Sequence, residues 1–303
     1  MKSNQRKISV LLVTLLILTV FVSACSPAAP EPSPAPEPGD PAGELPEAAD
    51  DPAEAEVIPA DGKVADIQSA GKIVLGTAAD YPPYEFIAEI DGNLEVVGFD
   101  IDIAREIAKD LGVELEIRDM DFDGLLAALV AGNIDFIVAG MVPTEERKQS
   151  VDFSIPYYSA EQRFLVRADE AGELNTIESL AGKRIGAQIS TVQEEIAKEQ
   201  ITDPAELRFL SRINDLVLDL KSDRIDGIVL VGPVAASYAN ADPQLEMSAI
   251  SFGQEDGVAI AIAQGNEDLV DAINATLTRL MDADLINQFI ADATALADEQ
   301  QVQ

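Results

Sequence analysis

The chain has 303 residues, with 55 Asp and Glu against 20 Lys and Arg, and its formal charge is −35. A surface this acidic repels phosphate backbones, which argues against nucleic-acid binding. The lack of His excludes His-ligated metals and Ser-His catalysis, and a single Cys excludes an intrachain disulfide and multi-cysteine zinc sites. We therefore expect a protein without metal or cofactor. With 47% hydrophobic residues, the chain can still fold around a core.

Residues 1–25 are predicted to be a signal peptide, with Lys2, Arg6 and Lys7 ahead of an uncharged apolar run at 8–22. This run is short for a membrane span, which needs about 20 residues. The next residues, Val22-Ser23-Ala24-Cys25, resemble the lipobox of bacterial lipoproteins. The resemblance implies cleavage before Cys25 and a diacylglycerol on its sulfur, which would anchor an extracytoplasmic protein to the cell membrane. A buried or idle Cys in an uncleaved anchor is the alternative.

Residues 26–62 are predicted to be a disordered tether. They hold 10 of the 17 prolines and 10 acids, but no Lys or Arg. Large apolar residues are nearly absent, so burial cannot offset the entropy lost on ordering. Since Pro-rich chain spans at most about 3.1 Å per residue, this segment reaches on the order of 100 Å.

From residue 63 onward, apolar runs of strand length alternate with amphipathic helical stretches. In the first half we expect strands at 72–78, 113–118 and 134–141, helices at 101–112 and 123–131, and a helix that starts at 143–147. In the second half we expect strands at 164–167, 183–188, 207–211, 226–231 and 257–263, with helices at 191–199, 213–222, 267–280 and 283–298. This alternation over about 240 residues predicts an α/β protein with parallel sheets and helices on both faces.

Small molecules bind α/β sheets at the carboxyl ends of strands, near helix N-termini. Two turns meet this rule: residues 78–86, and the turn after the strand at 134–141, where Pro143 and Thr144 are predicted to open a helix with Arg147 in its first turn. Free N–H groups and a guanidinium there would suit a carboxylate. The alternative for Arg147 is a surface ion pair with Glu145, Glu146 or Asp152.

Five segments occur in one order and at close spacing: GTAADYPPYEF (76–86), VGFDIDIAREIAKDLG (97–112), DMDFDGLLAALVAGNIDFIVAGM (119–141), PTEER (143–147) and VDFSIPYY (151–158). Together they resemble the family 3 extracellular solute-binding proteins, the polar-amino-acid receptors of bacterial ABC importers. The resemblance covers about 72–298.

This resemblance implies a two-lobed α/β clamp of the type II periplasmic-binding-protein-like fold, in which each lobe is a sheet flanked by helices and the ligand binds between the lobes. Lobe one would be 63–162 plus 254–303, and lobe two would be 163–253. The two crossings between the lobes, near 160–165 and 251–256, would form the hinge.

The family pattern also implies which residues meet the ligand. Tyr81 and Phe122 would be its aromatic neighbours, Ala139 and Gly140 would offer main-chain groups, and Arg147 would pair with the α-carboxylate through a planar two-pronged contact. On lobe two, the segment that contacts ligand upon closure carries Gln188, Ser190, Thr191 and Gln193.

Three positions depart from the pattern. Val231 stands where members that bind α-amino acids commonly have a carboxylate for the ammonium, Ala78 replaces a second acid, and Val142 replaces a hydroxyl residue. Because a buried ammonium needs a paired acid, we expect a carboxylate-bearing ligand whose other end is less polar than an ordinary amino acid. Asp80 or Glu85 would be a replacement acid, and a solvated turn and a helix cap are the alternatives for these two residues.

Five further acids are predicted to be structural: Asp100 and Asp102 as charges at a helix N-terminus, and Asp119, Asp121 and Asp123 in a strand-to-helix turn, with Asp123 near the cap. A cation site at the last three is the alternative.

These inferences predict an extracytoplasmic receptor of an ABC importer that binds an amino acid or related carboxylate and delivers it to the membrane permease. We expect a lipid-anchored monomer without catalytic residues. One alternative is a dehydratase-like enzyme on cyclic acids, for which Asp80, Glu85 and Glu194 are the candidate proton-transfer groups and against which Val142 and Val231 argue. The other is a ligand-sensing subunit of a signalling receptor, which would use the same clamp.

Overall fold

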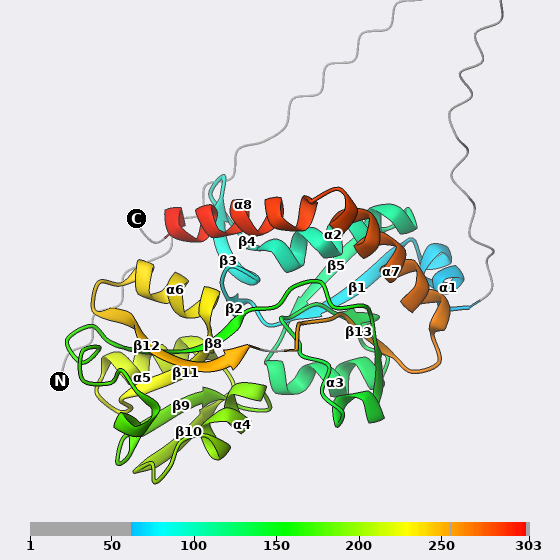
Figure 1. Cartoon of the computed structure of the whole chain (residues 1–303). Helices are drawn as coiled ribbons and strands as arrows, with labels where there is room; N and C mark the ends of the chain where they lie inside the picture. Colours follow the sequence, from blue (N-terminus) through cyan, green and yellow to red (C-terminus); the bar gives the residue numbers. More distant parts are fainter. Residues whose placement is uncertain (1–61, 255, 301–303) are drawn as a thin grey trace, which may run out of the picture. The chain divides into compact units, whose positions relative to one another are not determined.

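The computed structural model describes residues 62–254 and 256–300, which belong to one compact unit. The predicted signal peptide, Cys25 and the tether up to residue 61 lie outside the described residues. Two five-stranded sheets and one three-stranded sheet organise the fold, and helices pack around them (Figure 1). The two larger sheets are the centres of two lobes.

The sheet of lobe one has the strand order β5-β1-β6-β13-β7. Its strands are β1 (Lys72–Thr77), β5 (Glu114–Asp119), β6 (Phe136–Ile137), β7 (Val151–Phe153) and β13 (Ala261–Ala263). β1 runs parallel to β5 and β6, whereas β13 is antiparallel to β6 and β7. The prediction of parallel strands thus holds for β5, β1 and β6 but not for β13, which enters the sheet on the chain's return from lobe two.

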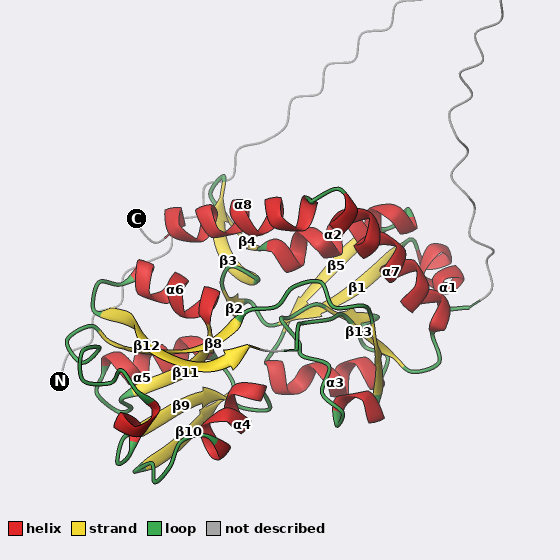
Figure 2. Cartoon of the chain, in the orientation of Figure 1, coloured by secondary structure: helices red, strands yellow, loops and turns green. Residues whose placement is uncertain are grey.

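Helices cover both faces of this sheet (Figure 2). They are α1 (Lys63–Ala70), α2 (Phe99–Leu111), α3 (Phe122–Val130), α7 (Glu267–Asp282) and α8 (Leu285–Gln300). α2 packs against α7 and α8, while α3 packs against β1, β6 and β13. As the apolar spacing of residues 101–111 predicts, α2 buries one continuous face, and it ends at Gly112, which has the left-handed φ of 71°.

A separate three-stranded sheet was not predicted. It consists of β2 (Asp80–Tyr81), β3 (Glu85–Ile90) and β4 (Asn93–Val97). The turn between β3 and β4 is formed by Asp91 and Gly92, both with positive φ. This sheet fixes the first of the two turns that the sequence marks as a binding segment.

The sheet of lobe two has the order β10-β9-β11-β8-β12. Its strands are β8 (Glu161–Arg167), β9 (Arg184–Gln188), β10 (Glu206–Leu210), β11 (Gly227–Val231) and β12 (Leu245–Gln254). β9 is parallel to β10 and β11, and β8 is antiparallel to β11 and β12. The helices of this lobe are α4 (Val192–Glu199), α5 (Ile213–Lys221) and α6 (Gly232–Ala241), and the short 3₁₀ turn η2 (Ile177–Leu180) precedes β9.

The segment around Pro143 differs from its prediction. The strand expected at 134–141 is limited to the two residues of β6, and Gly140 bends the chain with a φ of 53°. No helix opens at Pro143, and the only regular element there is the 3₁₀ turn η1 (Arg147–Gln149). The chain thus turns sharply after β6, which lets Arg147 fold back under this bend.

The chain passes between the two large sheets twice, between β7 and β8 and again between β12 and β13. The two crossing segments touch, since Tyr158 and Val258 form an antiparallel bridge. The lobe boundaries themselves stay a prediction. Within the described ranges, no helix combines the length and the apolar character needed to cross a bilayer.

Candidate ligand-binding site

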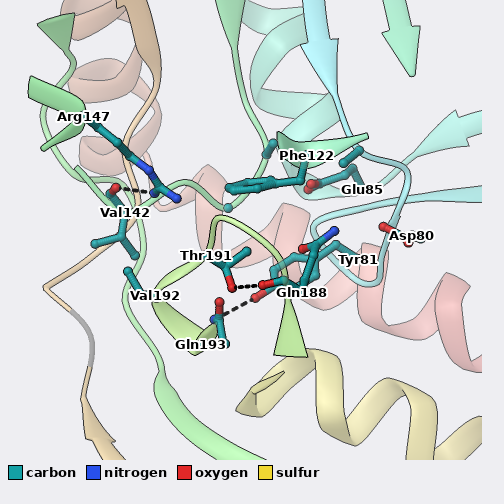
Figure 3. Close-up of a pocket in the computed structure, with 13 residues that line it drawn as sticks. Asp80, Tyr81, Glu85, Phe122, Val142, Arg147, Gln188, Thr191, Val192 and Gln193 are labelled. Carbon is teal, nitrogen blue, oxygen red and sulfur yellow. Dashed lines mark hydrogen bonds between the residues drawn. The ribbon is translucent and has the colours of Figure 1, made fainter. Parts of the chain in front are cut away.

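A pocket lies between the lobes, beyond the carboxyl ends of β1 and β6 and at the N-terminus of α4 (Figure 3). Its cavity is small, about 20 Å³, because side chains of both lobes meet there. Its lining consists of Ala78, Asp80, Tyr81, Glu85, Phe122, Ala139, Gly140, Val142, Arg147, Gln188, Thr191, Val192 and Gln193.

Eleven of the twelve residues predicted to bind ligand are in this lining; the twelfth, Val231, is not. Val231 is 1% exposed and packs in the apolar core just before α6. Val192, which was not predicted, joins the lining as the first residue of α4. Ser190 lies next to the pocket and lines the neighbouring cavity. Contact of these residues with a ligand stays a prediction.

Arg147 is 8% exposed. One of its terminal nitrogens donates to the carbonyl of Val142 and the other to the carbonyl of Ser190 in lobe two, each at 2.7 Å. Its guanidinium carbon is 5.4 Å from the centre of the Phe122 ring. No carboxylate of the described residues lies within ion-pair distance of it, so the surface ion pair that was its alternative is not formed. Burial lowers the pKa of Arg147 to about 10, which leaves it charged at neutral pH.

The wall from lobe two is the start of α4. Thr191 is its N-cap: the hydroxyl oxygen accepts from the backbone N–H of Glu194 at 3.3 Å, and the hydroxyl donates to the carbonyl of Gln188 at 2.6 Å. Gln193 donates to Gln162 of β8 at 3.0 Å and to the hydroxyl of Tyr81 at 3.4 Å, so it links lobe two to the aromatic wall of lobe one.

That aromatic wall depends on a glycine. Gly140 has a left-handed φ of 53°, and a Cβ at this position would lie 3.0 Å from the Tyr81 ring. Tyr81 in turn packs on Tyr84 with 5.1 Å between ring centres, and Tyr84 packs on the buried Phe99 at 4.4 Å. The ring at the pocket surface is thus held by rings in the core.

Asp80 is not in a solvated turn. It is 3% exposed, and one carboxylate oxygen accepts from the backbone N–H of Ile213 at 2.6 Å. The other oxygen, Oδ1, is buried with no hydrogen-bond partner among the described residues. Burial raises the pKa of Asp80 to about 6, opposed in part by the N–H of Ile213. At neutral pH the pocket therefore holds a mostly ionised carboxylate with one unused oxygen.

Glu85 is 1% exposed, and its Oε2 likewise has no hydrogen-bond partner in the described part of the chain. Burial raises the pKa of Glu85 well above its usual range, and the hydrogen-bonded Asp100 beside it adds to this shift. Asp100 accepts from the N–H of Gly140 at 2.9 Å and from the hydroxyl of Tyr157 at 2.8 Å, and burial raises its pKa to about 6. Two buried carboxyls in contact do not readily ionise together, so burial and contact favour a proton shared between Glu85 and Asp100.

Asp100 lies in the first turn of α2, as the sequence predicts. It is also fully buried and accepts from the N–H of Gly140, so it holds the main chain of the pocket, a role that the sequence did not indicate. Asp102, the other predicted helix-start charge, pairs with Arg105 on the surface. Asp119 and Asp121 both pair with Arg212. Among the described residues, no group of three or more acidic, Cys or His side chains is arranged to hold a metal ion.

The site thus places a charged guanidinium on one side and two buried carboxyl groups with unused oxygens on another. Figure 3 shows the Phe122 ring between Arg147 and Glu85. Such an arrangement can bind a small molecule that carries both a carboxylate and a cationic group, with aromatic faces along its length.

Comparison with known proteins agrees with this geometry. The family model for bacterial extracellular solute-binding proteins, family 3, matches residues 73–292. The arginine-binding extracellular protein ArtP of Bacillus subtilis is 37% identical over 214 residues, which are 70% of this chain and 81% of ArtP.

Two solved structures extend the comparison. A substrate-binding protein of an amino acid ABC transporter from Streptococcus pneumoniae, bound to L-arginine, is 37% identical with a TM-score of 0.75, covering 78% of this chain and 98% of that one. The ancestral amino acid-binding protein AncCDT-1, a precursor of cyclohexadienyl dehydratase, is 32% identical with a TM-score of 0.70, covering 76% and 99%. The predicted two-lobed clamp is confirmed, and the chain belongs to family 3 of the bacterial extracellular solute-binding proteins.

Proposed function

We propose that this protein is the extracytoplasmic receptor of an ABC importer and that it binds a basic amino acid such as L-arginine between its lobes. The observation that carries the proposal is the charge pattern of the pocket: Arg147 has no carboxylate partner among the described residues, while Asp80 and Glu85 each keep a buried oxygen without a donor. Relatives named for arginine binding support the same ligand class.

The ligand's carboxylate binds at Arg147. A guanidinium is planar and offers a fork of N–H donors that matches a carboxylate, and such charge-assisted bonds are about twice as strong as neutral ones. The carbonyl oxygen of Val142 orients the fork from its own lobe, and that of Ser190 adds a contact from lobe two. Since the guanidinium is already oriented, little side-chain entropy is lost on binding.

The ligand's cationic groups bind at Asp80 and Glu85. A basic amino acid has one carboxylate and two cations, which matches Arg147, the carboxylate of Asp80 and the negative charge that Glu85 shares with the buried Asp100. The rings of Tyr81 and Phe122 offer π faces to a cation between these ends. This proposal revises the sequence-based expectation of a less polar ligand: the acids lost at Ala78 and Val231 are replaced by Asp80 and Glu85, an option that the sequence left open.

Titration of the full chain with three ligands tests this proposal. L-arginine has both charges, L-citrulline keeps its shape but has a neutral side chain, and agmatine lacks the carboxylate. We expect L-arginine at 100 times its dissociation constant to stabilise the fold by about 2.7 kcal/mol. Citrulline and agmatine should each bind at least about 30-fold more weakly, because each leaves a buried charge without its partner. Equal affinity for arginine and citrulline would contradict the role of the acids, and equal affinity for agmatine that of Arg147.

The protein works by binding and release, without chemistry. The alternative of a dehydratase-like enzyme draws on the similarity to AncCDT-1 and on Glu85, because burial raises the pKa of this carboxyl well above its usual range. However, Glu85 shares its proton with the buried Asp100, and Val142 lies where a polar group would be needed at a reaction centre. We expect no turnover of prephenate-like or arogenate-like cyclic acids, as followed by loss of substrate absorbance. Measurable turnover would establish the enzyme.

The permease partner and the lipid on Cys25 complete the proposal. The family is extracellular by its description, and a receptor outside the cell needs an anchor to stay near its permease. A sensor role uses the same clamp, and a permease gene and an ATPase gene beside this one would favour import over sensing.

A further inference from the structure

A second set of contacts joins the two lobes outside the pocket, at the N-terminus of α5. Arg212, the N-cap residue of α5, donates through Nε to Asp121 at 2.5 Å and through a terminal nitrogen to Asp119 at 3.0 Å. Arg212 belongs to the lobe-two segment between β10 and α5, whereas both acids lie in lobe one between β5 and α3. One side chain of lobe two therefore holds two carboxylates of lobe one.

This ion-pair cluster is connected to the pocket through the turn that begins β2. The same oxygen of Asp119 that meets Arg212 accepts from the backbone N–H of Ala79 at 2.9 Å. The next residue, Asp80, lines the pocket and accepts from the N–H of Ile213, directly after Arg212. The hydroxyl of Tyr238 in α6 donates to the main-chain carbonyl of Asp80 at 2.8 Å. Pocket and interlobe contacts thus share one short segment.

We propose that Arg212, with Asp119 and Asp121, is a latch that holds the two lobes closed over the ligand, and that Asp80 links ligand binding to this latch. The identity of the ligand rests on the proposed function, whereas the ion pairs of the latch do not depend on it. Arg212 touches no residue of the pocket lining through its side chain, so it is a positioning residue. The contact between Arg147 and the Ser190 carbonyl is a separate contact between the lobes.

A latch changes the affinity for ligand by changing the fraction of molecules whose lobes are closed. Two-lobed binding proteins open and close about a hinge, and the apparent dissociation constant rises as the binding-competent fraction falls. The Arg212 side chain is 27% exposed, and those of Asp119 and Asp121 are 31% and 53% exposed. Solvent therefore screens the pair in part, and the loss should be moderate.

The variants Arg212→Gln and Asp121→Asn test the latch in the full chain, with Arg279→Gln as a matched control. Arg279 also pairs with two acids, Glu106 and Asp110, but all three lie in lobe one. We expect Arg212→Gln to weaken L-arginine binding about 3- to 10-fold, mainly through faster dissociation. The double variant should bind L-arginine no more weakly than Arg212→Gln alone, because Arg212→Gln already removes the interaction with Asp121. Arg279→Gln should stay within about twofold of the parent.

Three results would each overturn the latch. They are an unchanged affinity in Arg212→Gln, fully additive losses of affinity in the double variant, and a loss in Arg279→Gln equal to that in Arg212→Gln. A distance measurement without ligand distinguishes failure of the latch from failure of the proposed function. In the full chain with Cys25→Ser, spin labels at Lys109→Cys in α2 and Glu199→Cys in α4 report the distance between lobes. Arg212→Gln should shift the distance distribution toward the open form, whether or not L-arginine binds. An unchanged distribution would overturn the latch.

Discussion

Arg147 is a buried positive charge at the pocket, and its carbonyl partners cannot neutralise it. We predict that Arg147→Met weakens L-arginine binding by at least about 30-fold, since truncating one partner of a buried charged pair costs about 2–5 kcal/mol. Arg147→Lys keeps the charge but loses the planar fork, so it should recover only part of the affinity. Isothermal titration calorimetry measures both.

The matched control is Arg163→Met. The guanidinium of Arg163 also donates to two carbonyl groups, those of Ile250 and Ser248, but it lies outside the pocket lining. It should keep parental affinity for L-arginine. If Arg147→Met also kept parental affinity, the carboxylate would not bind at Arg147.

Glu85 and Asp100 make stability depend on pH. In the unfolded chain both titrate near pH 4, whereas in the folded protein burial raises the pKa of Asp100 to about 6 and that of Glu85 further. The folded state therefore binds more protons in this range, so its stability falls as pH rises from about 4 through 6 and above. We predict that Glu85→Gln, which removes the titrating group, is more stable than the parent at pH 8 and loses this advantage toward pH 5. Urea denaturation at both pH values measures this, and a difference that does not change with pH would contradict it.

At the residue level, the sequence was sufficient where a short motif fixes a position. Arg147 follows the turn after a buried strand and Tyr81 follows β1, so their convergence could be predicted. Asp100 could not: a carboxylate in the first turn of a helix usually faces solvent, and only the packing of Tyr157 and Gly140 around it shows its role. Val231 was placed by analogy with a family motif, and in the structure its side chain packs in the core.

Among the elements, α2 depends on the glycine before it. Gly98 is the N-cap residue with a φ of 128°, and a Cβ there would lie 2.1 Å from the carbonyl oxygen of Tyr84. We predict that Gly98→Ala destabilises the fold by about 2–4 kcal/mol, from backbone strain and overpacking together. Gly112→Ala is the control at the other end of α2: its φ is 71°, but no atom lies within 4 Å of the added carbon. It should cost about 1 kcal/mol, and equal losses in urea denaturation would contradict the steric argument.

The positions of helices and strands were predicted most accurately where the apolar pattern of the sequence was strong, as in β1 and α2. The β3–β4 hairpin was missed although Asp91-Gly92 is a recognised turn signal, because its strands carry apolar residues on both faces, including the exposed Ile87 and Leu94, so no clean alternation marks them. Pro143 was expected to open a helix, as proline often does. In the structure, the left-handed bend at Gly140 directs the chain into an irregular turn before η1.

For the molecule as a whole, the acidic surface and the predicted lipid have opposite effects on membrane contact. A chain of charge −35 is repelled by anionic headgroups, so the proposed lipid on Cys25 would be the attachment. We predict that the Cys25→Ser variant is no longer labelled by radioactive palmitate and no longer fractionates with the membrane. Cell fractionation and labelling measure this, and continued labelling of the Cys25→Ser chain would contradict the lipidation site.

We propose that the pocket binds a basic amino acid with its carboxylate at Arg147 and its cations at Asp80 and Glu85. A crystal structure of the protein with L-arginine is the most direct test. We expect both carboxylate oxygens of the ligand to lie within about 3 Å of the Arg147 guanidinium, and the ligand's nitrogens to donate to Asp80 Oδ1 and Glu85 Oε2. An arginine bound in the reverse orientation, or outside this pocket, would contradict this proposal.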